Sequence, residues 1–246
     1  MPVADNIAMV RERMNAAAKR TGRDPDAVRL MAVSKTVPPE LIRAAHLAGM
    51  RVFGENRVQE FAGKVDALRD LSNAEWHMIG HLQTNKAAKA AELFGAVDSI
   101  DSLRLAQKLN SAAQQVGKKL GVLVEINVGG EAAKTGVAPK SQELDKILQA
   151  APSFEHLEIR GLMTIPPRTD NPQEARPYFR KLRELQDEIG ARRLPGIAMA
   201  ILSMGMSYDF EIAIEEGSTC VRLGTAIFGD RKMPSRHPYS LHPKVE

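Results

Sequence analysis

Short apolar runs alternate along the chain with longer segments whose apolar residues recur at helical spacing. Residues 5–19 carry apolar side chains three and four positions apart, which predicts an amphipathic helix. The apolar run 30–33 predicts a short buried strand. Pro38 and Pro39 stop this strand and suit the first positions of a helix over residues 40–47. A strand followed by a helix is therefore the first structural unit that the pattern predicts.

The same unit recurs seven more times. Further strands are predicted at residues 51–55, 75–79, 96–100, 121–128, 157–165, 197–203 and within 219–228. Helices are predicted between them at residues 56–69, 85–93, 102–116, 141–151, around 178–189 and at 208–216. Eight strands alternating with helices are typical of a (β/α)8 barrel. The alternative is an open doubly wound sheet, but that fold usually has a glycine-rich phosphate turn after its first strand, and residues 34–38 do not form one.

Length and composition agree with a barrel and argue against several other classes of protein. The chain has 246 residues, and such barrels typically have about 250. Its 34 basic and 30 acidic residues are interspersed and only 4% of residues are aromatic, so no nucleic-acid surface is predicted. The single cysteine, Cys220, excludes an internal disulfide and a multi-cysteine metal site. No apolar run approaches the roughly 18 residues of a membrane span, and we expect a cytoplasmic protein.

Lys35 comes directly after the first predicted strand, which is the carboxyl end of the barrel in this fold. A lysine that is desolvated there can lose its proton and attack a carbonyl group, forming a Schiff base. The alternative interpretation is a side chain that extends from the strand end towards water. This stretch alone favours a lysine that extends towards water. Evidence for a Schiff-base lysine has to come from the rest of the chain.

Barrels often hold phosphate in the loops after strands 7 and 8. In this chain those two loops contain small and hydroxyl-bearing residues, namely Ser203, Ser207, Gly224 and Thr225. Small residues let the backbone approach an anion, and hydroxyl groups donate hydrogen bonds to it. Ser207 also opens the predicted helix 208–216, where it would be an ordinary N-cap, and the two roles are compatible. We expect Ser207, Gly224 and Thr225 to bind a phosphate, with Ser203 as a further cofactor contact.

Alternation along the eighth strand places Cys220, Arg222 and Gly224 on one face, towards the barrel interior. A buried arginine needs a partner, and the carboxylate of Glu125 and a bound ligand are equally good candidates. Cys220 would lie deeper, as a small core residue. A ligand with an aldehyde for Lys35, a phosphate for the two loops and a ring acceptor for Arg222 would satisfy all three sites. Pyridoxal 5′-phosphate has these three groups.

Six motifs, spread over nearly the whole chain, resemble those of one protein family. They are AVSKTVP around Lys35, FGENRVQE at 53–60, WHMIGHLQTNK at 76–86, GLMTI at 161–165, SMGMSYDFEIAIEEGST at 203–219 and VRLGTAIFG at 221–229. The family is that of the pyridoxal phosphate homeostasis proteins, once labelled proline synthetase co-transcribed homologues. The resemblance implies a barrel of the alanine racemase N-terminal type with pyridoxal phosphate on Lys35 and Arg222 facing the pyridine nitrogen. It also implies that Ser207, Gly224 and Thr225 hold the phosphate.

The same resemblance has consequences for catalysis. The positive charge of Arg222 disfavours protonation of the pyridine nitrogen, which makes the ring a weaker electron sink. Alanine racemases resemble this barrel but carry a further β-domain that supplies a tyrosine base, whereas 17 residues follow Gly229 here. We therefore expect one pyridoxal-phosphate-binding barrel over residues 1–230 and a flexible tail over 231–246. No second base is evident except Tyr239 in that tail.

Several other polar residues near predicted strand ends each have two interpretations. Asn56 and Gln59 form either a helix-capping pair or, for Asn56, a cofactor contact. His77 and His81 flank the end of the third strand without a carboxylate or cysteine at metal spacing, so no metal site is predicted, and His81 is placed at the mouth of the barrel. Lys134 lies in a glycine-rich loop, where a surface lysine is favoured over a transient acceptor of the aldehyde.

Three functions remain open at this point. The favoured one is a cytoplasmic, monomeric carrier that holds pyridoxal phosphate on Lys35, buffers it and passes it transiently to pyridoxal-phosphate-dependent apoenzymes, with little or no catalysis. The resemblance supplies the homeostasis role, and the residues supply the Schiff-base site. The second is a racemase-like enzyme acting on amino acids. The third is an aldolase-like barrel in which Lys35 acts directly on a sugar phosphate.

Overall fold

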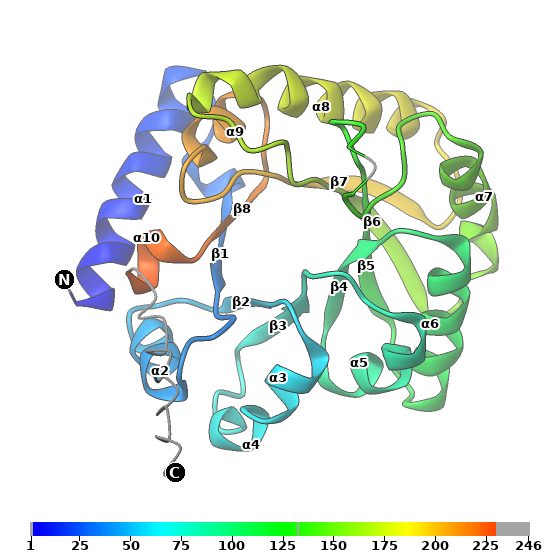
Figure 1. Ribbon diagram of the computed structural model, residues 1–246, viewed down its shortest axis with the longest axis horizontal. Coiled ribbons are helices and arrows are strands. Elements are labelled where there is room, and N and C mark those ends of the chain that lie inside the picture. The colour runs from blue at the N-terminus through cyan, green and yellow to red at the C-terminus, as the bar shows by residue number, and fades with distance from the viewer. Residues whose placement is uncertain (1, 132, 230–246) are drawn as a thin grey trace, which may run out of the picture.

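Eight parallel strands close into a barrel in the order in which they occur along the chain (Figure 1). The computed structural model describes residues 2–131 and 133–229, so the predicted tail 231–246 and Tyr239 lie outside the described residues. The strands are β1 (Arg29–Val33), β2 (Val52–Glu55), β3 (Glu75–Met78), β4 (Ala96–Ile100), β5 (Leu120–Glu125), β6 (Leu157–Met163), β7 (Ile197–Ser203) and β8 (Cys220–Leu223). The predicted (β/α)8 barrel is confirmed.

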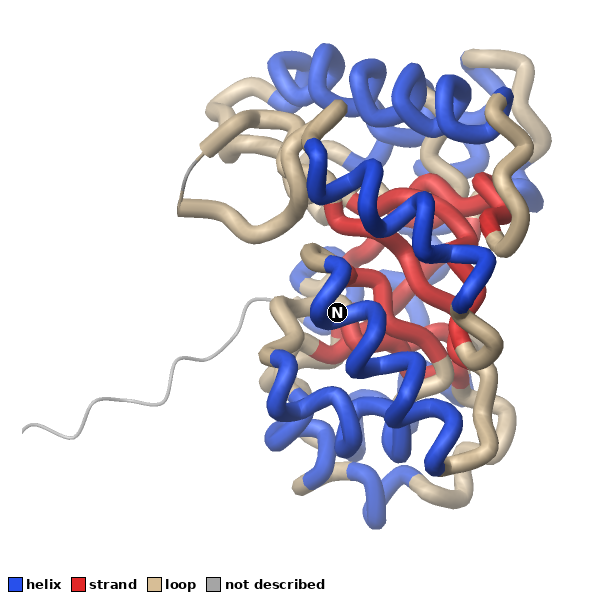
Figure 2. Tube along the Cα trace, turned by 90° about the vertical axis from the view of Figure 1, so that its right-hand side faces the viewer, coloured by secondary structure: helices blue, strands red, loops and turns tan. Residues whose placement is uncertain are grey.

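Helices cover the outside of this barrel, so that the strands form an inner layer between them (Figures 1 and 2). After the strands come α2 (Pro39–Leu47), α3 (Val58–Ala62), α4 (Val65–Leu68), α5 (Ala87–Leu93), α6 (Leu103–Gln115), α7 (Gln142–Ala150), α8 (Arg176–Ala191), α9 (Phe210–Glu215) and α10 (Thr225–Phe228). The additional helix α1 (Val3–Arg20) precedes β1, as predicted. Among the described residues, none of the helices has the length and apolar character needed to cross a membrane.

Helix α1 packs against α9 and α10, the last two helices of the described residues. Its apolar stripe is buried against α2, α9 and α10. Asn6 Nδ2 donates a hydrogen bond to the carbonyl oxygen of Ile227 at 2.9 Å, and an ion pair links Arg13 to Glu211 at 2.8 Å. α1 therefore covers the place where the first and last strands meet.

The core has two parts, one on each side of the barrel wall. Inside the barrel, Met31, Val33, Val52, Ile79 and Cys220 pack together. Outside it, a larger apolar layer lies between the strands and the helices. Burial raises the pKa of the Cys220 thiol to about 12, so this thiol stays protonated at neutral pH. The prediction that Cys220 is a small core residue is confirmed.

One predicted helix, residues 56–69, is wrong as a continuous element. The segment forms two short helices, α3 and α4, with Gly63 and Lys64 between them. Glycine is a poor helix former, and here it is the C-cap of α3, because its N–H donates to the carbonyl oxygen of Gln59 at 3.3 Å. The break turns Lys64 back towards the end of β1, where its side chain has buried partners.

Two further predicted boundaries are corrected by the structure. The fifth strand ends at Glu125 and not at residue 128, because the chain folds back and the Val137 N–H donates to the Glu125 carbonyl oxygen at 2.8 Å. The helix predicted at 208–216 begins at Phe210, because residues 207–209 form a turn instead. Ser207 therefore neither opens the helix nor caps it.

The packing of α1 gives a first testable prediction. Ile7 on its buried face is 2% exposed, whereas Met9 on its outer face is 46% exposed. We expect Ile7→Ala to lower the free energy of unfolding by about 2–5 kcal/mol, because it removes buried methyl groups and leaves a cavity. Met9→Ala, the control, should change it by no more than about 0.5 kcal/mol. Urea titrations of both variants check this, and equal losses would contradict the described docking of α1.

Candidate cofactor site

A cavity of about 250 Å³ opens at the carboxyl ends of the strands, where barrels bind their ligands. Its lining comes from the ends of β1, β2, β3 and β8 and from the loops after β6 and β7. The lining residues are Val33, Lys35, Asn56, Ile79, Ile165, Met206, Ser207, Tyr208, Arg222, Gly224 and Thr225. Six of the seven residues predicted as cofactor contacts therefore meet in one cavity, and Ser203 is the exception.

Lys35 follows the end of β1 by two residues and is half-buried, with Val33 and Ile79 among its apolar neighbours in the lining. The neighbouring Ser34 is fully buried, and its N–H donates to the carbonyl oxygen of Gly54 at 2.9 Å, which continues the β1–β2 pairing. Thr36, on the other side of Lys35, has a φ of 60°. The backbone turns sharply at this point, and the lysine side chain enters the cavity.

Arg222 reaches the same cavity from inside the barrel and is 4% exposed. Its Nη1 donates to Ser203 Oγ and its Nη2 to the carbonyl oxygen of Thr164, both at 2.7 Å. Burial lowers the pKa of Arg222 from its ordinary value. Two neutral acceptors therefore hold the guanidinium in place. Ser203 lies behind Arg222, outside the cavity lining.

The pairing of Arg222 with Glu125, one of the two alternatives that the sequence left open, is not among the hydrogen bonds and ion pairs of Arg222. The Glu125 carboxylate instead accepts a hydrogen bond from Thr135 Oγ1 at 2.8 Å, and its second oxygen is buried without a partner. Burial raises the pKa of Glu125 above its ordinary value. The chain folds back after β5 and brings Thr135 to one oxygen of this carboxylate, and of the two partners considered from the sequence a ligand remains for the arginine.

The small and hydroxyl residues after β7 and β8 lie against each other. Ser207 Oγ accepts a hydrogen bond from the backbone N–H of Ala226 at 3.3 Å, which joins the loop after β7 to α10. Gly205 has a φ of 95°, and a Cβ there would lie 2.5 Å from the Cβ of Ala213. The turn thus requires glycine at this position. Together these contacts place Ser207, Gly224 and Thr225 along one side of the cavity.

Asn56 lines the cavity from the end of β2, and its Oδ1 is buried without a hydrogen-bond partner. The capping pair with Gln59 is not formed, since α3 begins at Val58 and no side chain caps it. A Cβ on Gly80 would lie 2.4 Å from the Asn56 carbonyl oxygen, so the loop after β3 can approach only as glycine. An unpaired buried acceptor in a cavity is expected to meet a donor on a ligand.

The comparisons with known proteins agree with this geometry. The model of the family described as "Alanine racemase, N-terminal domain" matches residues 6–232. The pyridoxal phosphate homeostasis protein of Aquifex aeolicus (strain VF5) is 46% identical over 232 residues, which cover 94% of this chain and 100% of the relative. The chain belongs to the pyridoxal phosphate homeostasis protein family. The resemblance found in the motifs is confirmed.

Two solved structures are similar to this protein in fold. PipY of Synechococcus elongatus PCC7942, solved with PLP bound, is 36% identical, with a TM-score of 0.79 over 92% of this chain and 100% of PipY. An alanine racemase of Clostridium difficile 630 has a TM-score of 0.67 at 17% identity and covers 93% of this chain but 58% of the racemase. The second likeness shows a shared barrel fold alone.

The sequence reasoning missed part of the lining in this family member. Ile79, Ile165, Met206 and Tyr208 form much of the cavity wall, and none was predicted there. Ile79 could have been predicted, because it ends the third predicted strand and ligands of a barrel bind at the carboxyl ends of its strands. Tyr208 is 57% exposed and its hydroxyl donates to the carbonyl oxygen of Asp170, a partner far away in the sequence that no local pattern indicates.

His77, His81 and Lys134 lie outside the lining of this cavity. Nδ1 of His77 is 3.1 Å from a carboxylate oxygen of Asp98, and Nδ1 of His81 is 2.9 Å from one of Asp101. Asp98 lies on β4 and Asp101 directly after it, so the pairing of β3 with β4 brings these aspartates close to the two histidines. Lys134 Nζ donates to the Pro166 carbonyl oxygen at 3.1 Å and forms an ion pair with Glu131.

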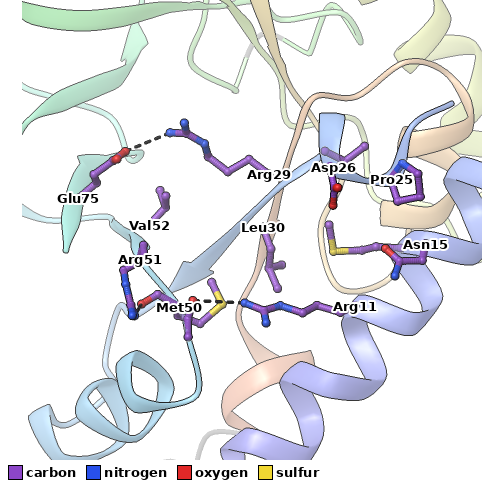
Figure 3. A pocket seen from close by; sticks show the side chains of 13 residues that line it. Arg11, Asn15, Pro25, Asp26, Arg29, Leu30, Met50, Arg51, Val52 and Glu75 are labelled. Carbon is purple, nitrogen blue, oxygen red and sulfur yellow. Dashed lines mark hydrogen bonds and ion pairs between the residues drawn. The ribbon is translucent and has the colours of Figure 1, made fainter. Parts of the chain in front are cut away.

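A second cavity, of about 480 Å³, lies between α1 and the amino ends of β1 and β2 (Figure 3). Three arginines line it, but their guanidinium groups already have partners. Arg29 pairs with Glu75 at 3.0 Å, and Arg11 donates to the carbonyl oxygen of Gly49 at 3.3 Å. Arg51 donates to the carbonyl oxygen of Met50 at 2.7 Å. Groups at the amino end of a barrel usually serve stability, so we do not assign the cofactor to this cavity.

The His77–Asp98 pair predicts a pH dependence of stability. Burial lowers the pKa of the half-buried His77, but Asp98 and, to a smaller extent, Glu75 raise it to about 9 from an ordinary value of 6.5. Because the folded-state pKa is the higher one, the contribution is complete below pH 6.5 and is lost as the pH rises through about 9. The loss is on the order of 3 kcal/mol.

Urea titrations from pH 6 to pH 9.5 measure this effect. In His77→Gln the fall in stability across that window should disappear. His81→Gln is the control, because its imidazole is also paired with an aspartate but its side chain is 51% exposed. A wild-type protein of constant stability across the window would contradict the assignment.

Proposed function

We propose that this protein binds pyridoxal 5′-phosphate as a Schiff base on Lys35 and acts in intracellular vitamin B6 homeostasis as a carrier or buffer. The observation that carries the proposal is the meeting of Lys35, Arg222 and the loop residues Ser207, Gly224 and Thr225 in one cavity. The name shared by the relatives and the bound PLP in PipY support it.

The residues of the cavity match the groups of this cofactor one by one. Lys35 supplies an amine for the aldehyde, with release of the carbonyl oxygen as water. Arg222 faces the pyridine nitrogen, and Ser203 supports Arg222 from behind. Ser207, Gly224 and Thr225 hold the phosphate through hydroxyl and backbone N–H groups. The remaining acceptor, Asn56 Oδ1, is buried without a protein partner and would accept a hydrogen bond from the ring hydroxyl of the cofactor.

Little catalysis is expected from these surroundings. The relatives are named as homeostasis proteins and not as enzymes. Among the described lining residues, the ionisable side chains are Lys35, Tyr208 and Arg222. Arg222 disfavours a protonated pyridine ring, and the Tyr208 hydroxyl is engaged by the Asp170 carbonyl oxygen. These lining residues therefore offer no evident second acid or base in addition to Lys35.

We further propose that the protein works as a monomer in the cytoplasm and passes its cofactor transiently to pyridoxal-phosphate-dependent apoenzymes. The cavity supports the transfer step, because its lining includes the exposed side chains of Ile165 and Tyr208, which belong to the loops after β6 and β7. A cofactor held there is reachable from outside the barrel without separation of the core strands.

The Schiff base is tested by absorption spectroscopy of the full chain with added pyridoxal phosphate. The wild-type protein should turn yellow, and borohydride should fix the cofactor covalently to the peptide containing Lys35. Lys35→Ala should show neither effect, since it lacks the amine. Lys89→Ala is the control, because Lys89 is paired with Glu92 on an exposed helix face. A wild-type protein that stays colourless at saturating cofactor would refute the cofactor site and favour the aldolase-like function.

The proposed lack of a second base is tested at Tyr208. We expect Tyr208→Phe to bind pyridoxal phosphate as the wild-type protein does, because the ring and its packing are retained while the hydroxyl bond to Asp170 is lost. Neither protein should racemise alanine or serine above the rate of free cofactor. Racemisation by the wild-type protein that disappears in Tyr208→Phe would establish the alternative of a racemase-like enzyme.

A further inference from the structure

Lys64 lies at the break between α3 and α4, and its ammonium group is nearly enclosed. The side chain is 12% exposed and Nζ donates to three oxygens. These are Glu55 Oε1 at 2.9 Å, Glu60 Oε1 at 2.9 Å and the carbonyl oxygen of Ser34 at 3.1 Å. None of these residues lines the cofactor cavity, so the group sits behind the end of β1 and not in front of it.

The cluster of Lys64, Glu55 and Glu60 forms hydrogen bonds with the residues on both sides of Lys35. On one side, Ser34 is held twice, since its carbonyl oxygen accepts from Lys64 and its Oγ donates to Glu55 Oε1 at 2.7 Å. On the other side, the N–H of Thr36 donates to Glu60 Oε1 at 2.5 Å. One ammonium group therefore connects, through two carboxylates, the residues immediately before and after the cofactor lysine.

The backbone at this point needs such support. Thr36 has a φ of 60°, in the left-handed region that a β-branched residue rarely adopts. A conformation of this kind persists only where the surrounding contacts determine it. The bond from its N–H to Glu60 is one such contact, and the Val37 N–H, which donates to the Ser34 carbonyl oxygen at 3.0 Å, is another.

The charges of the cluster depend on Lys64. Glu55 is fully buried, and burial raises its pKa above the ordinary value, while hydrogen bonds from Ser34 and Lys64 act in the opposite direction. Its second carboxylate oxygen has no partner. Removal of the ammonium would leave two carboxylates beside each other, one of them buried, and that arrangement is strongly unfavourable. Glu55 and Glu60 would then separate and release Ser34 and Thr36.

We propose that Lys64 is a positioning residue for the Schiff base: it fixes the direction in which Lys35 enters the cavity, acting through Glu55 and Glu60 without touching the cofactor. The effect on cofactor binding rests on the proposed function. The effect on the backbone around Thr36 can be measured independently, because its hydrogen bonds are present in the protein without cofactor.

The experiment compares Lys64→Met with Lys89→Met. Methionine keeps most of the length of the lysine side chain but removes the charge, and Lys89 forms an ion pair with Glu92 at 2.6 Å on an exposed face. At a temperature well below unfolding, we expect Lys64→Met to bind pyridoxal phosphate about 10- to 100-fold more weakly and to form the yellow complex more slowly, because the amine is misdirected. Lys89→Met should match the wild-type protein.

A second pair of variants tests the hydrogen bond from the Thr36 N–H to Glu60 by itself. It also keeps the inference testable if Lys64→Met does not fold. Glu60→Gln retains an oxygen that accepts from the Thr36 N–H, whereas Glu60→Ala does not. In the protein without cofactor, hydrogen–deuterium exchange of the Thr36 amide should be faster in Glu60→Ala than in Glu60→Gln. Cofactor affinity should follow the same order.

The outcomes separate this inference from the proposed function. If the wild-type protein forms no yellow complex, the proposed function fails, and the exchange measurement still shows whether the cluster holds the backbone. If the wild-type protein is yellow but Lys64→Met and Glu60→Ala bind cofactor with wild-type affinity and rate, Lys64 has no positioning role. A lower melting temperature with unchanged cofactor affinity also overturns the inference, because it indicates support of the fold alone.

Discussion

The pairing of the first strand with the last is the constraint on which the site depends. β1 and β8 run parallel in a register that sets Met31 beside Arg222 and Ala32 beside Leu223. This register closes the barrel, and it also makes the segments after the two strands leave the barrel side by side. Lys35 and the start of α10 at Gly224 and Thr225 therefore line the same cavity, although almost the whole chain lies between them. A slip of one residue would turn Arg222 out of the barrel interior.

The barrel and the residues that face its cavity could be predicted because they follow from local periodicity. Alternation along the eighth strand was sufficient to point Arg222 inwards, and the order of strands and helices was sufficient to place Lys35 at the carboxyl end. The partners of these residues could not be predicted in the same way. Arg222 donates to Thr164, 58 residues away, and the choice of that carbonyl over Glu125 depends on how the chain folds back after β5.

Lys64 was missed for a related reason. The segment 56–69 has a helical pattern throughout, and in a continuous helix Lys64 would be one more solvated charge. The interruption at Gly63 changes its direction. Glu60 and Glu55 are near Lys64 in the sequence, but the third acceptor, the Ser34 carbonyl oxygen, is 30 residues away and is brought close by the β1–β2 pairing. Ser207 shows the reverse case: its helix boundary was wrong, yet it still lines the cavity, because the position of a loop after β7 is set by the barrel and not by the exact start of α9.

The way in which Arg222 is held bears on what the site can do. A buried guanidinium is commonly neutralised by a carboxylate, but here its two bonds go to a hydroxyl and a carbonyl oxygen. Arginine remains protonated near neutral pH, so the guanidinium keeps its positive charge, and neither of its two bonded acceptors is a carboxylate. A pyridine nitrogen facing that charge stays unprotonated, and the ring then withdraws electrons weakly. In the proposed function, Lys35 and the loops after β7 and β8 would attach the cofactor. Such an arrangement would favour holding the cofactor over using it, which is the property that the proposed carrier requires.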